Sequence, residues 1–319
     1  MPVDPVVDGG VVPGWSAAPA DPAFSQLLAP GAVLRRLATG AIWSEGPVWL
    51  PEDGNVLWSD IPGNRVLRWS PSGEVSVFLD GAEFENGHTL DLDGSVIACS
   101  HGERRIERLG RDGTRTPIVE RYRGARLNSP NDVIVKSDGT IWFSDPQYGI
   151  VQAHEGHLAE SEIGDNLVFR FDPATGDLDA VTDAPDEPNG LAFSPDESIL
   201  YVADTSAALR TDGSGNHHIL AFDVVDGRRL ANPRLFYDCP AGLADGFRVD
   251  VEGRIWTSSL DGIRVVTPDG RELGRIPVPE KTSNCVFGGT EGNQLFITAG
   301  TSLYTIETAT RGATAWGAR

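Results

Sequence analysis

The sequence predicts an all-β fold, a six-bladed β-propeller, and three observations lead to this prediction. Six short apolar runs recur along the 319 residues, at spacings of 40, 45, 59, 55 and 40 residues. A turn rich in Gly, Asp or Pro precedes each run, and a further strand-like run follows it. Six self-similar units of this length, each sufficient for four short strands, indicate a propeller, whereas a β-sandwich would not give six-fold repetition.

The strands are expected in the same order within every unit. The six apolar runs are VLWSD (56–60), VIACS (96–100), IWFSD (141–145), LYVAD (200–204), IWTSS (255–259) and LFITA (295–299). The strands expected to follow them are RVLRWS, RIERLG, LVFRFD, ILAFDV, IRVVTP and SLYTIE. Most of these lead into another turn and a last strand. The third and fourth units are the longest, and residues 146–166 and 205–217 are expected to be insertions over one face.

The expected boundaries divide the chain into three parts. Residues 1–31 are rich in Pro and Ala and are expected to form an N-terminal extension outside the blades. Residues 32–308 form the propeller, and 309–319 a C-terminal tail. The segment AVLRRLAT (32–39) is expected to supply the outer strand of the last blade and so to close the ring.

Composition limits the partners. The net charge of −20 repels nucleic acid and anionic membranes, so neither is expected as a partner. No apolar run approaches the roughly 20 residues of a membrane span. The three cysteines lack metal-site spacing, and the N-terminus lacks the pattern of a secretory signal. A cytoplasmic location is therefore predicted, and nothing indicates an oligomer.

One oxygen-bearing residue stands ten or eleven positions before each apolar run. These residues are Glu45, Asn86, Asn131, Asn189, Asp245 and Asn284. Each falls at the start of the expected innermost strand of its blade, and innermost strands line the central channel, so the six should converge. Two carboxylates with several amide oxygens favour a hard divalent cation, Ca²⁺ first, with Mg²⁺, Mn²⁺ or Zn²⁺ as alternatives. A central metal site is therefore predicted.

Turn formation is the competing interpretation of these six positions. Asn and Asp are common turn formers at strand starts, which would account for the four Asn one at a time. It does not account for Glu45, since Glu has little preference for turns, nor for the common register.

Four motifs in order give a resemblance to a known family. They are SEGPVW (44–49), SPNDVIVKSDGTIWFSD (129–145), PNGLAFS (188–194) and LADGFRVDVEGRIW (243–256). Together they resemble the gluconolactonase and regucalcin (senescence marker protein) family, and DPQYG and HGERRI are similar to its bacterial gluconolactonase branch. The resemblance covers about residues 32–308 and implies a six-bladed propeller that holds one divalent cation and hydrolyses a sugar lactone such as glucono-1,5-lactone.

The resemblance also implies roles for individual residues. The family's metal ligands fall on Glu45, Asn189 and Asp245, and Asn131 matches a residue that touches metal or substrate. One position departs from the family: animal members carry a sugar-holding Arg two residues before the matched Asn, where this sequence has Ser129, with Arg126 slightly earlier. The lactone preference of those members does not carry over directly.

The expected mechanism is attack of water on a lactone carbonyl polarised by the cation. Asp245 is the candidate general base by family analogy, although a carboxylate that holds a cation is a weaker base. Asp132 is the alternative base. The candidate substrate-binding residues are Asn86, His88, His101, Asp132 and Tyr148. The HxxH of His154 and His157, in the insertion 146–166, is interpreted as a solvated loop.

Three other functions compete with the sugar lactonase. One is a lactonase or phosphotriesterase for a different ester, since a metal polarises P=O and C=O alike. Another is a non-catalytic calcium-binding propeller, and the last is a binding scaffold. The sequence has no GxSxG elbow and no phosphate-binding loop, so serine-hydrolase and nucleotide-binding functions are not indicated.

Overall fold

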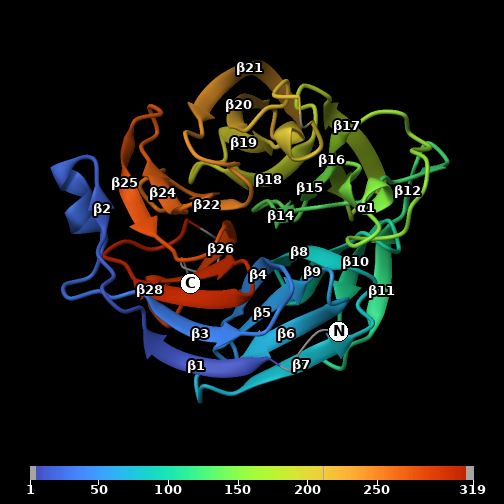
Figure 1. Ribbon diagram of the computed structural model, residues 1–319. Coiled ribbons are helices and arrows are strands. Elements are labelled where there is room, and N and C mark those ends of the chain that lie inside the picture. Colours follow the sequence, from blue (N-terminus) through green and yellow to red (C-terminus); the bar gives the residue numbers. More distant parts are fainter. Residues whose placement is uncertain (1–4, 211, 314–319) are drawn as a thin grey trace.

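Six antiparallel sheets, each with four blade strands, surround a central channel in the computed structural model, which describes residues 5–210 and 212–313 (Figure 1). The first three blades are β4 (Ser44–Leu50), β5 (Asn55–Asp60), β6 (Arg65–Trp69) and β7 (Val75–Asp80); β8 (Glu85–Leu90), β9 (Val96–Ser100), β10 (Arg105–Leu109) and β11 (Arg115–Val119); and β14 (Val133–Val135), β15 (Ile141–Asp145), β16 (Leu167–Asp172) and β17 (Asp177–Thr182).

The last three blades complete the circle. They are β18 (Pro188–Phe193), β19 (Ile199–Asp204), β20 (His218–Val225) and β21 (Arg229–Asp238); β22 (Phe247–Val249), β23 (Ile255–Ser259), β24 (Gly262–Val266) and β25 (Glu272–Pro277); and β26 (Thr282–Gly288), β27 (Gln294–Ala299), β28 (Ser302–Glu307) and β3 (Arg35–Thr39). The predicted six-bladed all-β fold is confirmed, and each apolar run forms the second strand of its blade.

The two ends of the chain share the last blade. Strand β3 pairs antiparallel with β28, as predicted for residues 32–39. The innermost strands β4, β8, β14, β18, β22 and β26 each contact the innermost strands of both neighbouring blades, so the ring is closed. A closed ring leaves no blade face exposed to water.

The described part of the N-terminal extension, residues 5–31, packs against the last two blades. Strand β1 (Val6–Val11) adds a fifth strand beyond β3, and β2 (Ala18–Pro19) pairs with β25. The 3₁₀ helix η1 (Pro22–Leu27) buries Phe24 and Leu27 between the last two blades. The extension is apolar enough to cover the outer edges of these blades, which a composition of Pro and Ala alone did not reveal.

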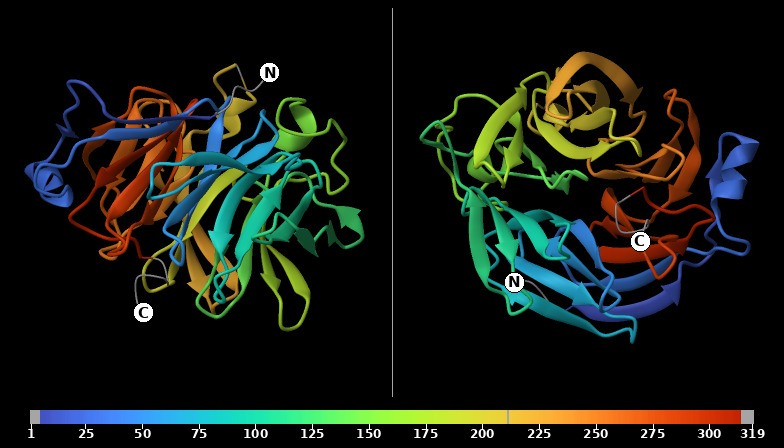
Figure 2. Two further views of the ribbon diagram at one scale, coloured as in Figure 1. Left: turned by 90° about the horizontal axis from the view of Figure 1, so that it is seen from below. Right: turned by 180° about the vertical axis from the view of Figure 1, so that it is seen from behind.

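Short elements complete the fold. A two-stranded ribbon, β12 (Arg121–Tyr122) and β13 (Ala125–Arg126), follows the second blade. The helices α1 (Tyr148–Val151) and η2 (Ser206–Ala208) begin the two insertions, and Figure 2 shows the α1 segment on one face of the disc. Within residues 5–210 and 212–313, no helix has the length and apolarity needed to cross a membrane.

Aspartates at the ends of three second strands fix the loops that lead into the innermost strands. Asp60 accepts hydrogen bonds from the backbone N–H groups of Ile42 and Trp43, at 2.8 and 3.1 Å. Asp145 and Asp204 accept in the same way, from Asn128 and from Asp186 and Glu187. These bonds satisfy loop amides that are shielded from water. The SD and AD endings of these three apolar runs therefore position the start of β4, β14 and β18.

Candidate active site

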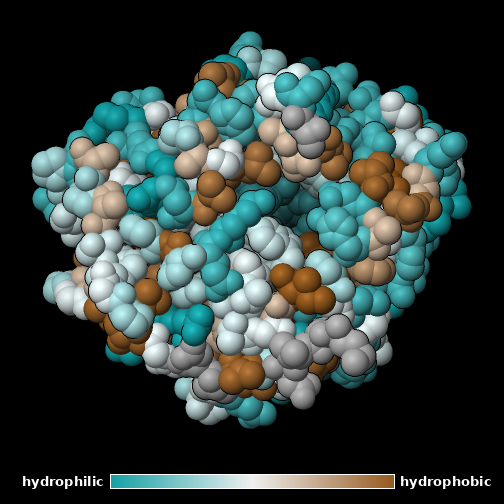
Figure 3. Space-filling model, in the orientation of Figure 1, coloured by the Kyte–Doolittle hydropathy of each residue, from teal (hydrophilic) through white to brown (hydrophobic). Residues whose placement is uncertain are grey.

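The six oxygen-bearing residues that precede the apolar runs form a ring at one end of the channel, because all six innermost strands start there. This set is called the carboxylate–amide ring, or simply the ring. Glu45, Asn86, Asn189 and Asn284 fall within the first three residues of β4, β8, β18 and β26. Asn131 and Asp245 come two residues before β14 and β22. Figure 3 shows a hollow near the centre of this face, with hydrophilic residues inside it.

Glycines bring the neighbouring blades into contact at this ring. A Cβ on Gly46 would lie 1.8 Å from the Asn86 carbonyl oxygen, and a Cβ on Gly190 2.3 Å from that of Asp245. Gly87 N–H donates to the Asn131 carbonyl at 2.9 Å. Only a residue without a side chain permits such an approach. The sequence analysis identified the polar residues but missed the glycines that follow four of them, at 46, 87, 190 and 246.

Glu45 is a buried carboxylate with neutral hydrogen-bond partners. Its Oε2 accepts from the backbone N–H of Gly46 at 2.8 Å and from Nδ2 of Asn284 at 3.2 Å. Burial and the charge of Asp245 raise the pKa of Glu45 well above its usual range. Two carboxylates that disfavour each other's ionisation are therefore held in one polar site.

Asp245 is partly buried beside the channel. Its backbone N–H donates to Ser258 Oγ at 3.0 Å, which fixes the residue ahead of β22. Burial raises the pKa of Asp245 to about 7, with contributions from the charges of Glu155 and Asp132, while the Lys281 charge opposes the shift. A carboxyl group with a pKa near neutrality can both accept and release a proton at working pH.

Asn189 is held by a buried hydroxyl relay. Its Nδ2 donates to Thr205 Oγ1 at 3.0 Å, and the Tyr148 hydroxyl bonds to the same Oγ1 at 2.6 Å. Tyr148 is 4% exposed. The structure thus places Tyr148, predicted to bind substrate, behind Asn189 as its support, and it adds Thr205, which the sequence analysis missed.

His101 and Asn86 form a second supported pair. Nδ1 of His101 lies 3.0 Å from the Glu155 carbonyl oxygen, which can only accept, so this nitrogen carries the proton. Nε2 then accepts from Asn86 Nδ2 at 3.3 Å. Burial lowers the pKa of His101 to about 4, so the imidazole is neutral at pH 7. Because the Nδ2 group of Asn86 faces His101, the amide oxygen of Asn86 is left available to a ligand.

Asn131 and Asp132 point their functional groups differently. Among the described residues the Asn131 side chain has no hydrogen-bond partner, so its amide oxygen is available to a ligand. Asp132 Oδ1 accepts from the Val133 backbone N–H at 2.9 Å, and its Oδ2 lies 3.5 Å from Nη1 of Arg248. Burial raises the pKa of Asp132, and the charge of Arg248 opposes this shift, so Asp132 remains the alternative general base.

His88 does not join this ring. Its Nδ1 bonds to the Gly46 carbonyl at 2.7 Å and its Nε2 to Glu85 Oε2 at 3.0 Å. The imidazole of His88 instead lines a cavity at the other end of the channel, which the later residues of the innermost strands form. Although His88 and Asn86 are only two residues apart, they serve different ends of the channel.

The insertion 146–166 contributes a residue that the sequence analysis assigned to a solvated loop. Gly156 packs so closely on Gly149 that a Cβ would lie 2.2 Å from the Gly149 carbonyl oxygen. This contact and the His101 bond fix Glu155, whose pKa burial raises to about 7, opposed by the Lys281 charge. Glu155 and Lys281 therefore belong to the site, and only the acidic character of the insertion hinted at this.

Ser129 fixes the start of the insertion 146–166. Ser129 Oγ donates to the Pro146 carbonyl at 2.7 Å and accepts from the Gly149 backbone N–H at 2.9 Å. Arg126 donates from Nη2 to the Glu103 carbonyl at 2.9 Å. Both side chains are therefore engaged in holding loops.

The donor set suits a divalent cation. Within the described residues, no group of three or more His, Cys, Asp and Glu side chains is arranged as a metal cluster. The ring supplies two carboxylates, Glu45 and Asp245, with amide oxygens instead. Glu45 receives no Lys or Arg hydrogen bond among the described residues, so a bound cation would offset the burial of its charge.

Comparison with known proteins identifies the family. Residues 43–301 match the SMP-30/Gluconolactonase/LRE-like region. A gluconolactonase from Zymomonas mobilis is 34% identical over 298 residues, covering 86% of this chain and 81% of that protein. A pentonolactonase from Haloferax volcanii is 32% identical, covering 83% and 84%. The structure of a gluconolactonase from Xanthomonas campestris is 41% identical with a TM-score of 0.87, covering 95% and 99%.

The fold and the ring define a six-bladed propeller with a carboxylate–amide site at one mouth of its channel. The chain belongs to the SMP-30/gluconolactonase family. The resemblance seen in the four sequence motifs is therefore confirmed, and the prediction of a gluconolactonase-like enzyme is confirmed at the level of the family.

Proposed function

We propose that the protein is a metal-dependent hydrolase that opens a sugar lactone of the glucono-1,5-lactone type to the aldonic acid. The observation that carries this proposal is the pairing of Glu45 and Asp245 with amide side chains at one channel mouth. Its relatives from Zymomonas mobilis and Haloferax volcanii, named as lactonases, support the substrate class.

Glu45, Asn189 and Asp245 would hold one divalent cation, with Asn131 as a fourth ligand or a substrate contact. The all-oxygen donor set favours Ca²⁺, while Mg²⁺, Mn²⁺ and Zn²⁺ are the alternatives. When bound, such an ion polarises a carbonyl oxygen and lowers the pKa of water. Asn189 keeps its orientation through Thr205, so the set is held in place before any ligand arrives.

The chain's own residues supply proton transfer and orientation. Asp245, whose pKa burial raises to about 7 in the absence of a cation, would accept the proton of the attacking water, and the negative charge of Glu155 adds to that rise. Neutral His101 fixes Asn86, whose amide oxygen can accept a hydrogen bond from a sugar hydroxyl. Water attack followed by cleavage of the ring ester C–O bond leaves a carboxylate and an alcohol.

The serine at position 129 is the reason to test more than one lactone. Without an arginine at that position, recognition of the sugar differs from that in the animal members, and other esters stay within reach of the same chemistry. A pentonolactone and a phosphotriester therefore stand beside glucono-1,5-lactone as substrates to compare.

The test is hydrolysis followed by pH-stat with chelator-treated protein, adding back Ca²⁺, Mg²⁺, Mn²⁺ or Zn²⁺ singly. Asp245→Asn is the test variant, and Asp269→Asn, at a surface turn, is the matched control. Lactone turnover that returns with metal in the wild type and the control, but not in Asp245→Asn, is the expected result.

Other outcomes would each contradict a different part of the proposal. Full turnover in chelator-treated protein would exclude metal dependence. Turnover of the phosphotriester alone would show that the substrates are phosphotriesters and not lactones. Tight metal binding with no turnover of any ester above the spontaneous rate would leave a calcium-binding propeller.

A further inference from the structure

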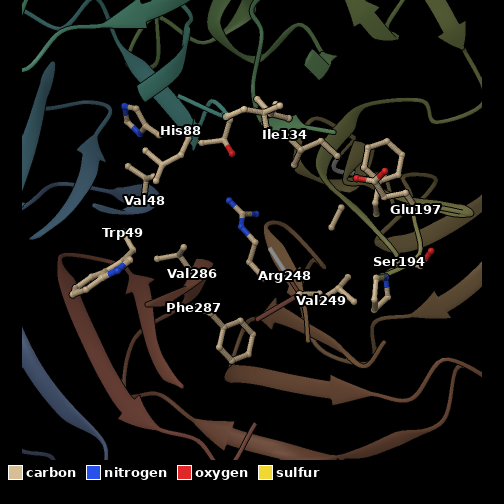
Figure 4. A pocket seen from close by; sticks show the side chains of 18 residues that line it. Val48, Trp49, His88, Ile134, Ser194, Glu197, Arg248, Val249, Val286 and Phe287 are labelled. Atoms are coloured by element: carbon tan, nitrogen blue, oxygen red, sulfur yellow. The ribbon is translucent and has the colours of Figure 1, made fainter. Parts of the chain in front are cut away.

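A second cavity lies at the opposite end of the channel from the carboxylate–amide ring. Its volume is about 160 Å³, and the later residues of the innermost strands form it (Figure 4). Examples are Val48 and Trp49 in β4, Phe193 in β18 and Val286 in β26. Because all innermost strands run in one direction, the ring and this cavity occupy different mouths of the same channel.

The walls of the cavity are predominantly apolar. Aliphatic and aromatic side chains dominate the lining, including Val48, Leu90, Leu92, Ile134, Phe193 and Phe287. An apolar cavity of about 150 Å³ is large enough for one benzene ring. The size therefore suits a ligand with a single aromatic ring or a short branched chain.

Arg248 places a charged group inside this apolar chamber. Figure 4 shows its guanidinium directed into the middle of the cavity. Nη1 donates to the Phe247 carbonyl at 2.8 Å and lies 3.5 Å from Asp132 Oδ2. Among the described residues, Nε and Nη2 have no hydrogen-bond partner, although the residue is only 8% exposed. One edge of the guanidinium fork is thus satisfied by the protein, and the other edge is open.

The other titratable lining residues, Glu197 and His88, are already engaged. Glu197 accepts from the Ser137 backbone N–H at 2.8 Å and from the Ser137 hydroxyl at 2.6 Å, and it pairs with Lys136 at 3.0 Å. Both ring nitrogens of His88 are hydrogen-bonded. Arg248 is therefore the group through which this cavity would recognise a ligand.

We propose that this cavity binds a small monocarboxylate with an apolar body the size of one aromatic ring. The Nε–Nη2 edge of Arg248 matches the two oxygens of a carboxylate, and such bidentate pairs are among the stronger hydrogen-bonded contacts in proteins. The apolar walls take up the body of the ligand. This inference is independent of the proposed lactonase function, because its site and its test do not involve the ring.

Isothermal titration of chelator-treated protein with benzoate tests the proposal. Benzamide has the same shape without the charge, and acetate has the charge without the ring. Benzoate should bind, and both analogues should bind at least about tenfold more weakly. Benzamide loses the charged partner of Arg248, and acetate loses the burial of the apolar ring.

Two variants locate the binding site. Arg248→Gln removes the charge, and Leu92→Trp fills the cavity from its rim without changing Arg248. Both should lose benzoate binding by about tenfold or more, with melting temperatures showing that each is folded. Leu235→Trp, on the outermost strand of the fourth blade, is the matched control. Asp245→Asn, in the ring, should bind benzoate as the wild type does.

Three results would overturn the proposal. The first is equal binding of benzamide and benzoate, which would remove the role of Arg248. The second is unchanged binding in folded Leu92→Trp, which would place the ligand elsewhere. The third is the absence of benzoate binding to the wild type at millimolar concentration.

Discussion

Asn284 donates a hydrogen bond from Nδ2 to Oε2 of Glu45 at 3.2 Å, across 239 residues of sequence. This bond joins the innermost strand of the last blade to that of the first, at the seam where the ring closes. Asn284 also accepts the backbone N–H of Cys285 at 2.8 Å through Oδ1, so both ends of its amide are used. One side chain therefore serves the candidate metal site and the closure of the propeller together.

Replacing Asn284 by Ala should lower the free energy of unfolding by about 2 kcal/mol, because a buried carboxylate loses a hydrogen-bond donor. Urea unfolding of chelator-treated protein measures this effect. Asn293→Ala, in the turn between β26 and β27 of the same blade, is the control and should change stability by less than about 0.5 kcal/mol. Equal effects of the two changes would show that the Asn284–Glu45 bond contributes nothing particular.

Gly46→Ala should be among the most destabilising single changes in the ring. Gly46 has a φ of 49°, and its Cβ would lie 1.8 Å from the Asn86 carbonyl oxygen. Gly73 has a φ of 84° with no atom within 4 Å of its Cβ position, so Gly73→Ala isolates the backbone strain alone. Thermal unfolding should show a loss of about 1 kcal/mol for Gly73→Ala and several times more for Gly46→Ala. Similar losses would mean that the neighbouring blade moves aside at little cost.

Phe24→Ala tests whether the N-terminal extension is part of the domain. Phe24 is fully buried, and a Cβ on Gly274 would lie 2.7 Å from its ring. Removing a buried phenyl ring costs about 3–5 kcal/mol. Val11→Ala, at an exposed position of the same segment, should cost less than about 0.5 kcal/mol. If Phe24→Ala leaves the chemical denaturation midpoint unchanged, the extension is an independent appendage.

A buried carboxyl pair predicts pH-dependent stability. Burial raises the pKa of Glu107 to about 7, and the neighbouring Glu85 adds to the shift. Between about pH 4.5 and 7 the folded protein keeps a proton that the unfolded chain has released. Stability from this group is therefore full at low pH and is lost as the pH rises through 7.

Glu107→Gln should flatten this part of the stability profile, since an amide does not titrate. Urea midpoints at pH 5, 6, 7 and 8 for the wild type and the variant measure the difference, which can reach about 1.4 kcal/mol per pH unit. Parallel profiles for the two proteins would show that Glu107 is ionised throughout.

Glu155→Gln should move the pH dependence of lactone hydrolysis. The negative charge of Glu155 raises the pKa of Asp245, so its removal allows Asp245 to lose its proton at lower pH. The acid limb of the rate profile should therefore shift to lower pH. Glu160→Gln, at an exposed position of the same insertion, is the control and should leave the limb in place. A loss of rate without a shift would assign Glu155 to substrate binding alone.

Repetition explains why so much of the fold could be predicted. Each blade repeats the same order of turn, apolar run and strand, so an error in one unit is corrected by the others. The register of Glu45, Asn189 and Asp245 followed from that repetition, because equivalent positions in a propeller meet at the axis. The assignment of residues 32–39 to the last blade is confirmed by the pairing of β3 with β28.

Features without repetition could not be predicted in this way. Glu155 reaches the channel mouth because Gly156 packs on Gly149, a contact inside a single insertion. Thr205 supports Asn189 from a loop that no other blade shares. Asn86 and His88 were both expected to bind substrate, but β8 runs along the channel and carries His88 to the cavity at the other mouth.

The shared last blade also sets the order of events during synthesis. The pairing partners Thr39 and Ser302 are separated by nearly the whole propeller, so β3 is made long before β28 exists. At about 5–20 residues per second, that interval is roughly 13–53 s. During it β1, which pairs with β3 in the finished protein, is the one local strand available to cover it. The N-terminal extension can thus cover the edge of β3 until β28 has been synthesised.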